Sequence, residues 1–100
     1  AIRKACKKLG TIDLSGCTLY STLEPCPMCF SAIHWAKISK IVYGASISDA
    51  KEAGFSELTI SNEVMKEKGE SHVEIIKDFM RNECLEVLRE WEKRGDGEVY

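Results

Sequence analysis

Two cysteines separated by two residues are the part of this sequence best suited to chemistry. Cys26 and Cys29 lie in the run Pro25-Cys26-Pro27-Met28-Cys29, where a strand-like stretch gives way to a helix-like one. A helix N-terminus stabilises thiolates through its dipole and unpaired N–H groups, and zinc binds thiolates. The bare spacing fits three kinds of site, which are a redox dithiol, a four-cysteine structural zinc site and half of a catalytic zinc site.

The other cysteines and the two histidines offer no obvious further ligands. A four-cysteine site needs a second closely spaced pair, and the remaining cysteines contain none. His34 follows Cys29 by five residues, so on a helix it points away from that thiol. We expect core or surface positions, and not metal ligation, for five residues: Cys6, Cys17, Cys84, His34 and His72.

The elements that must position the cysteine pair follow from hydrophobic periodicity. We expect a helix up to residue 9, then strands over 17–23, 40–45 and 72–77. A helix is expected over 27–36, a loop over 46–54, and partly helical structure over 55–69. The apolar stripe of a last helix is Met80, Cys84, Val87, Leu88 and Trp91. This order predicts an α/β fold with mostly buried strands.

The first helix carries a full apolar stripe from the start of the sequence. Ile2, Ala5, Cys6 and Leu9 form this stripe, and Gly10 is a suitable C-terminal stop. Since no capping residue precedes Ile2, we expect the helix to be part of a longer one. A short, frayed helix is the alternative.

The composition limits the classes of protein. One hundred residues with 44% hydrophobic and 30% charged content suit one folded domain. No apolar run approaches the roughly 20 residues of a membrane span, and the first ten residues resemble no signal peptide. We therefore expect a cytoplasmic protein with no membrane partner. A net charge of −2 gives no general case for nucleic-acid binding, so such a partner is not expected.

The residues around the cysteine pair carry a family resemblance. LYSTLEPCPMCFSAIH, together with AIRKACKKLG before it and KIVYGA and DAKEAGF after it, resembles the cytidine/nucleobase deaminase superfamily over residues 1–57. The resemblance implies a three-layer α/β/α fold with a mixed sheet, here lacking the N-terminal strands. Residues 1–100 would be the C-terminal part of a single deaminase domain.

The resemblance also implies a zinc cofactor and a reaction. Cys26 and Cys29 would be two zinc ligands, and a zinc-bound water would attack the ring carbon that bears an amine, releasing ammonia. The family's H-x-E motif supplies a further ligand and the catalytic Glu, and its expected place is N-terminal to Ala1. No catalytic residue is therefore assigned within this chain, and we expect the chain alone to be inactive.

Two residues favour a guanine or guanosine substrate among the family's nucleobases and nucleosides. Glu57 follows Gly54-Phe55, as an acidic base-contacting residue does in guanine deaminases, and Tyr100 matches a terminal Tyr of that group. A solvated Glu and a flexible tail are the alternative interpretations. HVEIIK instead resembles tRNA adenosine deaminases, and a cytosine or cytidine substrate is a further alternative. A noncatalytic fragment or partner subunit with a vestigial metal site also remains open.

The resemblance further implies a homodimer, because members of this family usually dimerise. Phe30, Ile33 and Trp35, which adjoin the cysteine pair, could form the interface, and packing in the core is the competing role for each.

Overall fold

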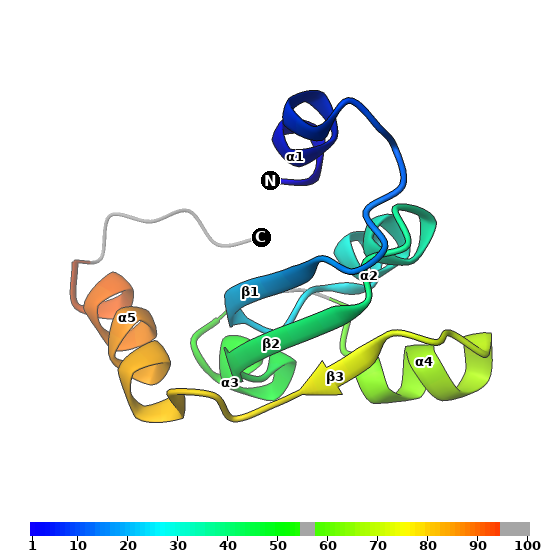
Figure 1. The fold of residues 1–100 in the computed structure, drawn as a ribbon. Coiled ribbons are helices and arrows are strands. Elements are labelled where there is room, and N and C mark those ends of the chain that lie inside the picture. The colour runs from blue at the N-terminus through cyan, green and yellow to red at the C-terminus, as the bar shows by residue number, and fades with distance from the viewer. Residues whose placement is uncertain (55–57, 95–100) are drawn as a thin grey trace.

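The computed structural model describes residues 1–54 and 58–94, which form five helices and three strands (Figure 1). In chain order they are α1 (Ile2–Leu9), β1 (Thr18–Leu23), α2 (Pro27–Trp35), β2 (Lys40–Ala45), α3 (Ile47–Glu52), α4 (Asn62–Gly69), β3 (Glu74–Ile76) and α5 (Arg81–Arg94). Within the described ranges, none of the helices has the length and apolar character needed to cross a membrane.

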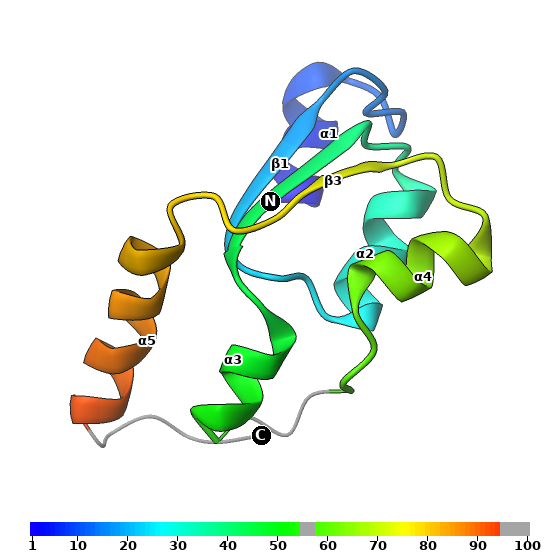
Figure 2. The same ribbon diagram turned by 90° about the horizontal axis from the view of Figure 1, so that it is seen from below.

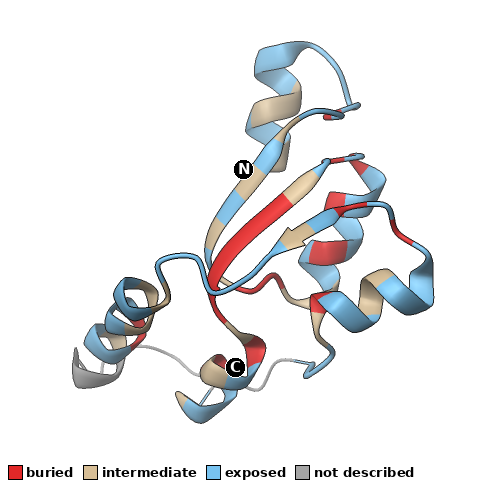
Figure 3. Ribbon diagram, turned by 60° about the horizontal axis from the view of Figure 1, so that its bottom comes forward, coloured by how far each residue is buried: buried red, intermediate tan, exposed pale blue. Residues whose placement is uncertain are grey.

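The described strands form one sheet in the order β1-β2-β3, and both pairings are parallel. Ile41 of β2 pairs with Leu19 of β1 and with Ile75 of β3. The central strand is buried along nearly its whole length, as Figure 3 shows. A parallel strand covered on both faces needs apolar residues at consecutive positions, and the KIVYGA run supplies them.

One face of the sheet packs against α1, α2 and α4. Alternate side chains of β1 and β2, including Leu19, Ile41 and Tyr43, meet Phe30 and Ile33 of α2 in the main core. The apolar stripe of α1 packs against the same cluster, and so does Met65 of α4. Gly10 ends α1 in the left-handed conformation at φ 69°, as the sequence predicts.

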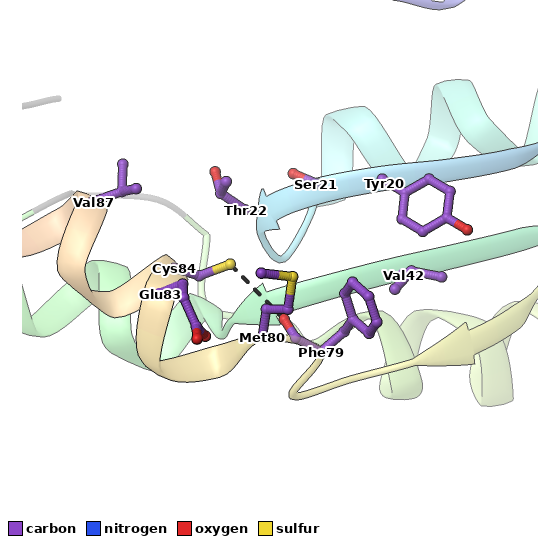
Figure 4. A pocket seen from close by; sticks show the side chains of 9 residues that line it. All are labelled: Tyr20, Ser21, Thr22, Val42, Phe79, Met80, Glu83, Cys84 and Val87. Atoms are coloured by element: carbon purple, nitrogen blue, oxygen red, sulfur yellow. Dashed lines mark hydrogen bonds between the residues drawn. The ribbon is translucent and has the colours of Figure 1, made fainter.

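The opposite face of the sheet is covered in part by α5, so the described elements form three layers. In Figure 2, α5 lies on one side of the strands and α2 and α4 lie on the other. The segment before α5 contributes Phe79, whose ring is 6.3 Å from that of Tyr20. A hollow of about 310 Å³ remains between this segment, α5 and β1 (Figure 4).

The stretch over 46–54, expected to be a loop, contains a helix instead. Ser46 is the N-cap of α3 and accepts a hydrogen bond from the Asp49 N–H, while the Asp49 carboxylate accepts one from the Ser46 N–H. This reciprocal capping box satisfies two helix N–H groups. The prediction of a loop over 46–54 is wrong, because the Ser-x-x-Asp spacing of Ser46 and Asp49 starts a helix there.

The apolar stripe expected for the last helix is only partly buried. Met80 precedes α5 in a left-handed conformation and is exposed, and Val87 also remains exposed. Leu88 is buried as expected, and Cys84 is partly buried against the sheet. The helix covers only part of its sheet face, which leaves the rest of its stripe in contact with solvent.

Candidate metal centre

The two cysteines of the PCPMC run meet at the N-terminus of α2. Cys26 is the N-cap, with an extended backbone at φ −67° and ψ 167°, and Pro27 occupies the first turn. Proline suits this position because its missing N–H would have no helical partner there. One turn of helix brings Cys29 beside Cys26, and the two Sγ atoms lie 3.5 Å apart.

This separation fits joint binding of one zinc ion. Two thiolates bound tetrahedrally at Zn–S distances of 2.3 Å would lie about 3.8 Å apart, close to the distance observed. Cys26 and Cys29 therefore could supply two ligands, and residues 1–54 and 58–94 contain no cluster of three potential ligands.

The other cysteines and histidines lie elsewhere. Cys6 and Cys17 pack against the core cluster, and Cys84 lies on the opposite face of the sheet. His34 is exposed, and its Nδ1 is 3.2 Å from the Ser71 hydroxyl oxygen. His72 is exposed in the segment before β3.

A cleft of about 440 Å³ adjoins the cysteine pair between α1, β1 and α2. Cys29 and Pro25 form part of its wall, Ser21 and Leu19 come from β1, and Ile2 and Arg3 come from α1. This volume lies in the range of small-molecule sites. The cleft therefore places a predicted metal ligand in the wall of a space large enough for a nucleobase.

A buried carboxylate supports the segment that leads into the cysteine pair. Glu24 is only 5% exposed, and its two carboxylate oxygens accept hydrogen bonds from the Ile47 N–H at 3.0 Å and the Asn62 N–H at 2.8 Å. The fully buried Asn62 side chain donates to the Pro25 carbonyl oxygen at 2.6 Å. Glu24 and Asn62 look like ordinary polar residues in the sequence, and only their hydrogen bonds beside Pro25 in the fold reveal a role.

Tyr43 completes the surroundings of Glu24. Burial, and then the nearby Glu24 charge, raise the pKa of the Tyr43 hydroxyl above its ordinary value of 10.0. Tyr43 therefore remains neutral beside this carboxylate throughout the physiological pH range.

The three residues considered for a dimer interface divide between two environments. Phe30 and Ile33 are buried in the core of the chain, so the interface role is wrong for both. They point from α2 toward the sheet, where α2 must bury its apolar face. Trp35 is 82% exposed at the end of the same helix. The two residues predicted to contact substrate, Glu57 and Tyr100, lie outside the described residues.

Known proteins resemble this chain in sequence and in fold. A family model of MafB19-like deaminases matches residues 1–83. The chain belongs to the MafB19-like deaminase family. It is 39% identical over 100 residues to the guanine deaminase of Bacillus subtilis (strain 168), covering all of this chain and 64% of that protein. It is also 41% identical over 87 residues to the tRNA-specific adenosine deaminase of the same organism, covering 87% of this chain and 52% of the relative.

The solved structures agree with the sequence relatives. The guanine deaminase of Nitrosomonas europaea superposes with a TM-score of 0.82 at 28% identity, covering 93% of this deaminase-family chain and 54% of that one. This similarity confirms both the superfamily resemblance and the expected α/β fold class. The chain spans about half to two thirds of the length of the curated relatives it matches.

Proposed function

We propose that this protein uses zinc to deaminate a nucleobase or nucleoside hydrolytically, with a guanine-type substrate favoured. The observation that carries the proposal is the thiol pair, 3.5 Å apart at the α2 N-terminus and beside a cleft of nucleobase size. Membership of a deaminase family gives this geometry its chemical meaning. Residues 1–100 would form the C-terminal part of a single deaminase domain.

In this proposal, Cys26 and Cys29 hold the metal, and the cleft walls orient the flat ring of the substrate. Bound zinc would lower the pKa of a water molecule so that it can attack the ring carbon bearing the amine. Leu19 and Ile2 give the cleft apolar surface that can contact the ring. We assign the third protein ligand and the proton-transferring glutamate to residues outside 1–100, as the family resemblance implies.

A guanine-type substrate is supported by the relative that matches the whole chain, the Bacillus subtilis guanine deaminase. Glu57 would accept hydrogen bonds from the adjacent N–H groups of guanine, and Tyr100 would close a neighbouring subunit's site. The tRNA-specific relative, at 41% identity, supports adenosine in tRNA as the second candidate. The mixed charge of α5 favours the small-molecule substrate over RNA.

We further propose that the protein is a cytoplasmic homodimer. The exposed Trp35 ring supports the interface part of this proposal, since large aromatic side chains are enriched in interfaces. A reducing compartment suits a site that depends on two thiolates.

Metal content and ammonia release test the function. We expect the full-length protein, loaded with zinc, to release ammonia from guanine faster than from cytidine or an RNA hairpin containing adenosine. Cys26→Ser and Cys29→Ser should each weaken zinc binding by at least a hundredfold, measured by competition with a chromophoric chelator. Cys17→Ser, which changes a thiol outside the pair, should keep its zinc.

The opposite results would contradict separate parts of the proposal. Zinc binding that survives both serine substitutions would exclude the assigned ligands. Preferred turnover of the RNA hairpin would replace the guanine-type substrate with the tRNA type. Ammonia release by residues 1–100 alone would contradict placing the catalytic glutamate outside them, whereas a full-length protein without zinc or turnover would support the noncatalytic alternative.

A further inference from the structure

Glu24 holds together three parts of the fold next to the metal centre. Its backbone N–H donates to the Ala45 carbonyl oxygen at 2.7 Å, which extends the contact between β1 and β2. Its carboxylate accepts from Ile47, the first residue of α3, and from Asn62, the first residue of α4. One side chain therefore ties the first turns of two helices to the end of β1, where the PCPMC run begins.

Asn62 extends this connection to the peptide bond before Cys26. Its side-chain amide donates to the Pro25 carbonyl oxygen at 2.6 Å, while its Oδ1 is buried with no hydrogen-bond partner. A buried amide oxygen without a partner is unfavourable for folding. An amide nevertheless stands at this position. Its hydrogen bond to the Pro25 carbonyl oxygen is the contact that an apolar side chain of the same size could not make.

That bond constrains the direction of the Cys26 side chain. The Pro25 carbonyl belongs to the planar peptide group that ends at the Cys26 nitrogen. On the other side, the Cys26 carbonyl oxygen accepts from the Phe30 N–H at 2.8 Å, within α2. Cys26 is thus held at both of its peptide groups, and this fixes its Cα–Cβ bond toward Cys29.

We infer that Glu24 and Asn62 are positioning residues that set the Cys26 thiolate at the distance from Cys29 that zinc requires. Neither residue touches the metal in this inference. The Glu24 carboxylate holds the backbone N–H of Asn62. The Asn62 side chain in turn holds the Pro25–Cys26 peptide. The inference rests on the proposed function only in naming zinc as the ion that the two thiolates hold.

Two nearly isosteric variants in the full-length protein test this role. Glu24→Gln replaces one acceptor oxygen with an amide group that faces a backbone N–H, and Asn62→Leu removes the donor to Pro25. Each should weaken zinc binding by about tenfold to a hundredfold, the usual cost of losing a group that orients a ligand. Asn62→Leu also removes the buried oxygen that has no hydrogen-bond partner, which offsets part of its cost in folding stability. Its loss of zinc affinity should therefore be larger than its loss of stability would explain.

Asp49→Asn provides the matched control. It weakens the bonds of the Asp49 carboxylate to Arg81 and to Ser46, while Asp49 makes no hydrogen bond to Glu24, to Asn62 or to the PCPMC run among the described residues. We expect the control to lose stability and to keep the wild-type zinc dissociation constant. If Glu24→Gln, Asn62→Leu and Asp49→Asn all changed zinc affinity only in step with stability, Glu24 and Asn62 would be structural, and the inference would be overturned.

A second probe keeps this test independent of zinc. Phenylarsine oxide captures two thiols only when they can reach one arsenic atom, so its rate of reaction reports the spacing of Cys26 and Cys29 directly. We expect wild type and Asp49→Asn to react at the same rate, and Glu24→Gln and Asn62→Leu to react several-fold more slowly. If wild type bound no zinc, the proposed function would fail, and equal arsenical rates in all four proteins would separately overturn the positioning role.

Discussion

Gly44 illustrates how far a single residue decides the packing of α5. A β-carbon built on Gly44 would lie 2.7 Å from the Cys84 Cβ and 2.7 Å from the Phe79 carbonyl oxygen, and it would overlap the Cys84 sulfur. The missing side chain lets the start of α5 approach the centre of the sheet. Glycine is thus required here for close approach, a role that its position within a strand suggests.

Gly44→Ala is therefore expected to destabilise the fold by about 3 kcal/mol, because α5 would have to move away from β2. The free energy of unfolding in urea measures this loss. Gly69→Ala is the control, since nothing beyond its chain neighbours and the nearby backbone of its own helix lies within 4 Å of the added carbon, and the residue ends α4. The control should be neutral or stabilising by up to about 1 kcal/mol. Equal losses in both variants would contradict the close-approach role.

An ion pair connects two helices that follow different strands. Arg81 at the start of α5 donates two hydrogen bonds to the Asp49 carboxylate of α3, at 2.6 and 3.0 Å. These bonds from Arg81, with support from Ser46, lower the pKa of Asp49 from its ordinary 3.8 to about 2. A planar guanidinium that meets a carboxylate with two bonds fixes orientation as well as distance.

The lowered pKa predicts a pH-dependent contribution to stability. Because the folded-state pKa lies below the unfolded one, the contribution is complete above about pH 4 and disappears as the pH falls through about 2. Asp49→Asn should therefore be less stable than wild type by about 1 to 2 kcal/mol at pH 7, a value reduced because Arg81 is partly exposed. Urea unfolding at several pH values checks this. A difference that stayed constant down to pH 2 would contradict it.

The two faces of the sheet differ in how completely they are covered. The face toward α1, α2 and α4 carries the main core and the cleft beside Cys29. The face toward α5 is covered less completely, and Tyr20 remains 69% exposed on it. The candidate chemistry therefore lies on the better-packed side, where the cysteine pair has rigid support.

The exposed Trp35 gives the proposed homodimer a direct test. Trp35→Ser should shift the full-length protein from dimer to monomer, raising the dissociation constant of the dimer by at least tenfold, as is usual for an aromatic residue at the centre of an interface. Light scattering coupled to gel filtration measures the molar mass. Ile12→Ser, which removes an apolar side chain of similar exposure from the loop after α1, is the control. A dimer unchanged by Trp35→Ser would exclude this face as the interface.

Much of the fold could be predicted because its signals are local. The run KIVYGA predicts a buried strand, and β2 has the same bounds, while PCPMC predicts the helix start at Pro27. The strand expected over 72–77 is shorter, at Glu74–Ile76, and the loop expected over 46–54 contains α3. The first difference arises because β3 pairs with β2 only from Glu74 to Ile76, and the second arises from the capping box that starts α3 at Ser46.

The family, the α/β class and the two candidate zinc ligands follow from the sequence, because each depends on neighbouring residues and on spacing along the chain. The support of those ligands depends on the tertiary structure. Ile47 follows Glu24 by 23 positions and Asn62 follows it by 38, and the three residues meet only when β1, α3 and α4 converge. Burial removes water as an alternative hydrogen-bond partner. A carboxylate and an amide that look like ordinary polar residues in the sequence therefore hold the PCPMC run in place.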